Sequence, residues 1–294
     1  MIHTIDLHFQ QIPKTIAAFI VESSEGPILV ETGPHSTFPQ LKKGIEKLGY
    51  RIEEIQHVLL THIHLDHAGS SWAFAENGAV VYVHPLGYGH LNAPERLMES
   101  AARIYKDQMH SLWGQMKPIP EQQPQKVENG EVITIGQNQF TAWHTPGHAV
   151  HHIAWQLNDK LFCGDVAGVK VNGGPVVPPC PPPDINLEDW KQSIELMRNL
   201  ELSSIYLTHF GEIKDWKTHL NALERVLNDW ANWILPHFKA GREMNDIIPD
   251  FQNHVKQSLL DAGLTQEGLA QYEAANPSWM SVAGLLRYWK KRLP

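Results

Sequence analysis

The chain has 294 residues, of which 42% are hydrophobic, so the composition predicts a folded protein with a substantial core and argues against disorder. The 32 acidic residues outnumber the 24 Lys and Arg residues, and the net charge of −8 disfavours a nucleic-acid-binding protein. Two cysteines are too few for a disulfide framework, and neither a signal-peptide pattern nor an apolar run of about 18 residues occurs. We therefore expect a cytoplasmic protein with no nucleic-acid or membrane partner.

The first third of the chain contains short apolar or alternating segments bounded by Gly and Pro, a pattern typical of strands. The predicted strands cover residues 2–9, 15–22, 27–31, 57–60 and 79–84. Leu41, Ile45 and Leu48 recur at helical spacing, so a short amphipathic helix is predicted over residues 39–48.

A helical insert is predicted at about residues 90–116, where apolar side chains again recur at helical spacing. We expect one or two helices here, forming a wall or lid beside the main fold. Strands are predicted to resume after the insert, over residues 132–135, 139–144, 152–157 and 160–163.

The sequence VVPPCPPP at residues 176–183 contains five prolines, which fix the backbone and remove donors, so a stiff internal loop is predicted. A helix over residues 187–200 and a buried strand over residues 204–209 follow. Beyond Lys214 the apolar spacing is helical throughout, and five of the ten tryptophans lie there. This pattern predicts a domain over residues 1–213 and a helical extension over residues 214–294 packed on it. A homodimer interface is a second use for these tryptophans.

The stretch THIHLDHAG at residues 61–69 places three histidines and an aspartate within six residues. In extended backbone His62 and His64 point to the same side, while Asp66 and His67 point elsewhere if a helix begins there. Two such pairs suit two adjacent metal ions, because imidazole and carboxylate groups are ligands of zinc, iron, manganese and cobalt.

Three further apolar runs lead to a histidine or an aspartate, namely His148, Asp165 and His209. Side chains at strand ends can converge on one rim of a sheet, where α/β proteins often place their sites. His151 and His152 follow closely, and we expect them to support the site and not to bind metal.

The motif HIHLDH, with the three downstream residues, resembles the H-x-H-x-D-H signature of the metallo-β-lactamase fold superfamily. The resemblance covers about residues 2–211, and all seven ligand positions of the dinuclear members are matched in order. It implies an α/β fold, a four-layer αββα sandwich with the metals at one edge, to which the C-terminal helices would be added.

The resemblance also implies a ligand set for two divalent metal ions, with zinc as the first expectation and iron or manganese as alternatives. Carried over by position, the ligands of one metal are His62, His64 and His148. Those of the other are Asp66, His67 and His209, with Asp165 bridging the two. One departure is Glu31, where members usually have Asp, and we expect a local shift to absorb the extra methylene.

The resulting hypothesis is a metal-dependent hydrolase in which a hydroxide bridging the metals attacks the carbonyl of a small ester, thioester or lactone. Asp66 is its catalytic residue, orienting the nucleophile or passing a proton to the leaving group. Tyr105, Trp113 and Arg103 of the insert are candidates for binding this small-molecule substrate. Two alternatives stay open: a mononuclear iron enzyme similar to persulfide dioxygenases of the same superfamily, and a non-catalytic module with structural metals.

Overall fold

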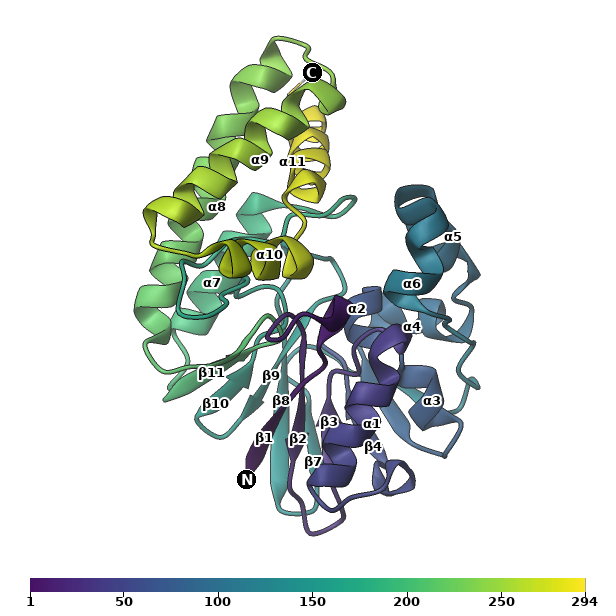
Figure 1. Ribbon diagram of the computed structural model, residues 1–294. Coiled ribbons are helices and arrows are strands. Elements are labelled where there is room, and N and C mark those ends of the chain that lie inside the picture. Colours follow the sequence, from purple (N-terminus) through teal and green to yellow (C-terminus); the bar gives the residue numbers. More distant parts are fainter. Residues whose placement is uncertain (294) are drawn as a thin grey trace.

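Two six-stranded sheets packed face to face form the centre of the protein in the computed structural model, which describes residues 1–293 (Figure 1). The strands of the first sheet, in spatial order, are β1 (Ile2–Asp6), β2 (Ala17–Val21), β3 (Ile28–Val30), β4 (His57–Leu59), β5 (Val80–Val83) and β6 (Pro124–Lys126). Those of the second are β12 (Gly211–Ile213), β11 (Ser204–Leu207), β10 (Lys160–Phe162), β9 (Ile153–Leu157), β8 (Asn138–His144) and β7 (Val132–Ile135).

Strand direction brings several strand ends to one edge of the sandwich. In the first sheet β3, β4, β5 and β6 run parallel. In the second sheet β10 and β11 are parallel, and β8 runs the same way as β10 because both are antiparallel to β9. The segments that leave β4, β8, β10 and β11 therefore emerge together, as expected for residues that form one site.

Three buried apolar layers separate four layers of secondary structure. The middle layer lies between the sheets and includes Phe19, Phe140 and Trp155. Because side chains alternate along a strand, Ile20 beside Phe19 faces the opposite way and joins the layer under the first set of helices. The four-layer αββα sandwich predicted from the sequence is confirmed.

The first sheet is covered by helices from the first half of the chain. Their bounds are α1 (Phe38–Lys47), α2 (Leu65–Ala68), α3 (Ser71–Ala75), α4 (Pro85–Asn92), α5 (Glu95–Tyr105) and α6 (Met109–Trp113). Short 3₁₀ turns accompany them at η1 (Phe9–Gln11), η2 (His35–Thr37), η3 (Ile52–Glu54) and η4 (Lys106–Gln108). The predicted insert thus contains α5 and α6 and lies beside the site edge (Figure 1).

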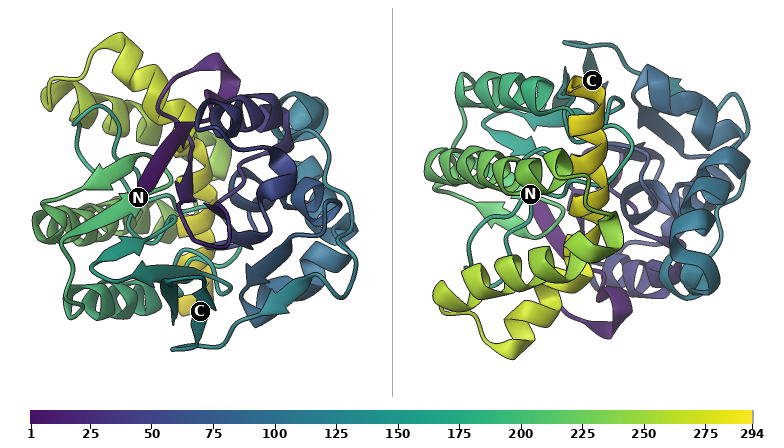
Figure 2. Two further views of the ribbon diagram at one scale, coloured as in Figure 1. Left: turned by 90° about the horizontal axis from the view of Figure 1, so that it is seen from below. Right: turned by 90° about the horizontal axis from the view of Figure 1, so that it is seen from above.

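Helices from the second half of the chain cover the second sheet and extend beyond it. They are α7 (Leu187–Arg198), α8 (Trp216–Lys239), α9 (Met244–Asp261), α10 (Gln266–Ala275) and α11 (Ser278–Arg292). Leu220 and Leu223 of α8 share one apolar cluster with Ile205 and Leu207 of β11, so the C-terminal helices and the sheet have a continuous core. Figure 2 shows α11 between α8 on one side and the insert helices on the other. None of the helices within residues 1–293 combines the length and apolar character that a bilayer crossing needs.

Candidate metal centre

The seven predicted ligands come from four segments that meet at one edge of the sandwich. His62 and His64 lie in the turn after β4, and Asp66 and His67 lie in α2, the short helix that follows. The other three follow β8, β10 and β11 and are His148, Asp165 and His209. The structure collects them into two groups of potential donor atoms, each group lying within 4.8 Å.

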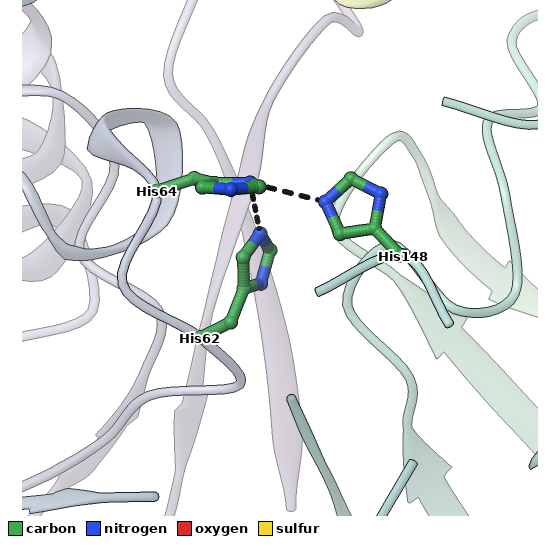
Figure 3. Close-up of side chains that lie close together, drawn as sticks. All are labelled: His62, His64 and His148. Carbon is green, nitrogen blue, oxygen red and sulfur yellow. Dashed lines mark hydrogen bonds between the residues drawn. The ribbon is translucent and has the colours of Figure 1, made fainter. Parts of the chain in front are cut away.

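The first group consists of three imidazoles, His62, His64 and His148 (Figure 3). His64 Nδ1 lies 2.9 Å from His62 Nε2 and 3.0 Å from His148 Nε2. His62 and His148 are buried, whereas His64 is partly exposed.

The hydrogen bonds behind this group determine which nitrogens carry protons. Thr61 Oγ1 donates to Glu31 Oε1, so it accepts from His62 Nδ1 at 3.0 Å. His148 Nδ1 donates to the Pro179 carbonyl at 2.8 Å. The Nε2 lone pairs of both rings are therefore free, and both face His64 Nδ1, which can carry only one proton. At most one of the two lone pairs can therefore accept a proton from His64, and a cation bound by the three nitrogens would satisfy both.

The second group combines two carboxylates with two imidazoles. Asp165 Oδ1 lies 3.3 Å from both His67 Nε2 and His209 Nε2. Asp66 Oδ2 lies 3.6 Å from His67 Nε2 and 3.5 Å from His209 Nε2. Asp66 is the most exposed of the four, with 21% of its side chain accessible, whereas the other three are buried.

Asp165 connects the two groups. While its Oδ1 faces the second group, its Oδ2 lies 3.4 Å from His148 Nε2 of the first. A carboxylate with one oxygen toward each donor group is suited to hold two neighbouring cations. The position of Asp165 is fixed from behind, because its backbone N–H donates to His152 Nε2 at 3.2 Å and the His152 ring is tied to the Thr145 hydroxyl. His152 therefore supports the site, as predicted.

Several buried polar atoms of the second group lack a hydrogen-bond partner within residues 1–293, which also suits this group to bind a cation. His67 Nε2, His209 Nε2 and Asp165 Oδ1 are buried and make no hydrogen bond with any described residue, which is costly for a polar atom unless a ligand completes it. Tetrahedral ligands about 2.0–2.1 Å from a zinc ion lie about 3.3 Å apart, close to the separations found here. Nitrogen and carboxylate donors also suit iron and manganese.

The two groups differ in the charge that their side chains carry. Burial and the neighbouring imidazoles lower the pKa of His62 well below its ordinary value, and burial followed by His148 lowers that of His64 to about 3. Burial likewise lowers the pKa of His148. The three-histidine group is therefore neutral at pH 7 and keeps its lone pairs available.

In the second group the carboxylates reverse this effect. Burial opposes charge on His67 and His209, but Asp66 and Asp165 raise the pKa of His67 well above its ordinary value and that of His209 to about 9. Burial also opposes ionisation of Asp66, yet His67 and His209 lower its pKa to about 2. Protons on the two imidazoles thus balance the two carboxylates, and a divalent cation would take over that balance.

Glu31 lies behind the second group in the position where the sequence departs from the superfamily pattern. Its side chain is buried, and Oε1 is 3.3 Å from His67 Nδ1. The same oxygen accepts from the Thr61 hydroxyl, so one carboxylate contacts the support of both groups. Its backbone adopts a φ of +66°, in the left-handed region that residues other than glycine rarely occupy.

The insert and the C-terminal helices meet near the site. Tyr105 of α5 packs edge-to-face on Trp113, with ring centroids 4.9 Å apart, and its hydroxyl donates to Met280 Sδ at 3.1 Å. Burial raises the pKa of Tyr105, and the charge of Asp66 raises it further, so the hydroxyl stays protonated. Trp279 also contacts Tyr105, and sequence analysis missed both Trp279 and Met280 because residues so distant in sequence carry no shared pattern. Arg103 is exposed, and its role in substrate binding stays a prediction.

Comparison with known proteins assigns the family. The sequence model of the metallo-beta-lactamase superfamily matches residues 13–209, a segment that contains all seven candidate ligands. The chain belongs to this superfamily, as its motif predicted.

Individual relatives are distant. The chain is 24% identical over 228 residues to the metallo-beta-lactamase fold-containing protein ST1585 of Sulfurisphaera tokodaii, covering 76% of this chain and 84% of that protein. It is 25% identical over 203 residues to an atrochrysone carboxyl ACP thioesterase of Aspergillus fumigatus, covering 66% of this chain but only 39% of the thioesterase. The crystal structure of TTHA1429, a metallo-beta-lactamase family protein of Thermus thermophilus, superposes with a TM-score of 0.69 at 20% identity. That match covers 99% of this chain and 93% of the other, so the C-terminal helices are part of the shared fold.

Proposed function

We propose that the protein is a hydrolase that uses two divalent metal ions, zinc in the first instance, to cleave a small ester, thioester or lactone. The observation that carries the proposal is the placement of Asp165 between a neutral three-histidine group and a carboxylate-rich group. Two metal ions held side by side are a recurrent arrangement for hydrolysis at a carbonyl or phosphoryl centre.

The imidazoles of the first group and Asp66 have different roles in the proposed reaction. When bound, the metals would generate a nucleophile from water near neutral pH and polarise the scissile carbonyl. The three imidazoles of the first group stay neutral and so retain their lone pairs. Asp66 is ionised and partly exposed, which suits it to orient the water and to carry a proton toward the leaving group.

The aromatic surface beside the site supports an organic substrate. Tyr105 and Trp113 of the insert, with Trp279 and Met280 of α11, would contact its apolar part. The protonated Tyr105 hydroxyl would exchange its bond to Met280 Sδ for one to a substrate oxygen. Because one relative is named as an ACP thioesterase, we favour thioesters among the three proposed substrate classes.

The proposal is tested by metal analysis together with a panel of short-chain aryl esters, acyl thioesters and lactones. We expect two zinc ions per chain and hydrolysis of at least one class. The His62→Ala variant should lose metal and activity, whereas Asp66→Asn should retain the metal of the first group and lose about 10²-fold or more in kcat.

Matched controls separate these effects from general damage to the fold. His110→Ala and Asp107→Asn change exposed residues of the insert and should leave metal content and kcat unchanged. Full metal content and hydrolysis in His62→Ala would refute the proposal. One iron per chain after anaerobic purification, with oxygen consumption, would instead support the dioxygenase alternative.

A further inference from the structure

The proline-rich segment at residues 176–183, here called the proline loop, lies between the three-histidine group and the C-terminal helices. Five of its eight residues are prolines, which have no N–H group and a fixed φ. Val177 pairs with Val169 in an isolated antiparallel β-bridge, and beyond it the prolines interrupt any backbone ladder. From Pro178 to Pro183, the carbonyl groups and the N–H of Cys180 are the backbone groups left to anchor the loop.

On one side the proline loop contacts a candidate metal ligand directly. The carbonyl of Pro179 accepts a hydrogen bond from His148 Nδ1 at 2.8 Å. Because a carbonyl only accepts, this bond keeps the proton on Nδ1 and leaves Nε2 free, and it also fixes the direction of the ring. Both atoms are buried in the interior beside the second sheet, where His148 is only 1% exposed.

On the other side the loop is anchored by the end of α10 and by α11. Ser281 Oγ accepts from the Cys180 N–H at 3.3 Å, and Asn276 Nδ2 donates to the Pro178 carbonyl at 3.3 Å. The residues on both sides of Pro179 are thus tied to the C-terminal helices, while Pro179 itself is tied to His148. Arg287 Nε and Lys291 Nζ add bonds of 3.2 Å and 3.0 Å to the Pro183 carbonyl.

Gly284 lets α11 approach the loop this closely. A Cβ atom built at this helical position would collide with the Cys180 carbonyl oxygen and lie 2.9 Å from the carbonyl carbon. Those are backbone atoms of a stiff loop and cannot rotate away. Any side chain at residue 284 must therefore displace either α11 or the proline loop.

We infer that α11 is a positioning element for the metal centre, acting through the proline loop on His148, with Ser281 and Gly284 as its positioning residues. The inference rests on the proposed metal-binding role of His148. The C-terminal extension thereby sets the metal affinity of the three-histidine group, although it lies far from all three histidines along the chain.

The test compares Zn²⁺ binding by the full-length wild type, Gly284→Ala and Ser281→Ala, using chelator competition for both equivalents of metal. Gly284→Ala should weaken Zn²⁺ binding about tenfold or more, and Ser281→Ala about threefold. With Co²⁺ as a probe, the visible absorption bands of the bound metal should shift in Gly284→Ala, reporting an altered ligand geometry.

Two controls separate positioning from loss of stability. Gly89→Ala adds the same methyl group to a helical glycine whose Cβ would meet no other part of residues 1–293 within 4 Å beyond its own helix backbone, and it should leave affinity unchanged. Trp289→Phe removes the bond from Trp289 Nε1 to the Ala231 carbonyl, loosening α11 on α8 without touching the loop, and should lower the melting temperature but not the affinity.

Zn²⁺ affinity within twofold of wild type in a folded Gly284→Ala protein would overturn the inference. If that variant fails to fold, unchanged affinity and an unchanged Co²⁺ spectrum in Ser281→Ala would overturn it instead. Failure of the wild type to bind Zn²⁺ at all would refute the metal centre itself, and the inference with it.

Discussion

Glu31 shows how one side chain can affect both halves of the candidate centre. Its Oε1 accepts from Thr61, which supports His62, and lies near His67 of the second group. Glu31 Oε2 is buried and has no hydrogen-bond partner in the described part of the chain, so the carboxylate is held by these contacts and not by solvent. A residue of this kind orients ligands and increases their basicity without contacting the metal.

We expect Glu31→Gln to weaken Zn²⁺ binding at the second group about tenfold or more, because the amide replaces the negative charge facing His67 and buries an unmatched NH₂ group. Isothermal titration with Zn²⁺ measures this effect. Glu46→Gln, on the exposed face of α1, is the matched control and should bind as wild type does. Equal affinities in the two variants would contradict the supporting role of Glu31.

At this scale the sequence predicts the candidate ligands and the side chains of Glu31 and His152 that support them, but it misses the supports that the backbone provides. Seven side chains with a known motif stand at strand ends, where the spacing of residues along the chain is enough to recognise them. The carbonyls of Pro179 and Thr15, which accept from His148 and His209, have no such signature, because every residue carries a carbonyl. Their role follows only from the tertiary contacts.

The packing of α8 against the second sheet depends on a buried neutral histidine. His219 Nε2 donates to the Ala167 carbonyl at 2.7 Å, two residues beyond Asp165, and the side chain is buried. Burial lowers the pKa of His219 to about 4. In the unfolded chain a histidine has a pKa of about 6.5, so the unfolded state binds a proton first as the pH falls.

Stability should therefore be lost as the pH drops from about 6.5 to about 4, by up to about 3 kcal/mol from His219 alone. His219→Gln keeps a donor for the Ala167 carbonyl but does not titrate. Its free energy of unfolding, measured with denaturant at several pH values, should fall less steeply than that of the wild type. Parallel pH curves for the two proteins would contradict this account.

The elements that sequence analysis missed are short or atypical. β6 and β12 have three residues each and are largely exposed or partly exposed, so they lack the apolar run that marks a buried strand. α4 contains two glycines and begins at a proline, and its helical character comes from packing on β6 and α5. The longer strands and helices agree with their predicted ranges because local pattern and burial coincide there.

Across the whole molecule, the candidate centre joins segments from both sheets, so metal binding should stabilise the folded chain. Free Zn²⁺ at 100 times its dissociation constant adds about 2.7 kcal/mol, which for a chain of this length corresponds to roughly 5 °C in melting temperature. Thermal unfolding with Zn²⁺ and with a chelator measures this difference. A double variant, His62→Ala with His209→Ala, should show no such rise, and an equal rise would indicate binding elsewhere.

The predicted domain boundary at residue 213 stays a prediction. Residues on its two sides share one apolar core, so the boundary does not separate two independent cores. Leu223 and Leu227 of α8 belong to the same apolar cluster as Trp190 of α7 and Ile205 of β11. Periodicity revealed that the chain beyond Lys214 is helical, but it carries no information on which surface these helices cover. That depends on long-range complementarity between surfaces distant in sequence.

The anchoring of the proline loop by α11 has a consequence for recombining relatives of this chain. A chimera that exchanges only the C-terminal helices would place a foreign helix against residues 178–183, where a single methyl group at residue 284 already collides with backbone. The loop and α11 should therefore be inherited as one block. Crossover points that respect this block fall before Val176 and not at Lys214.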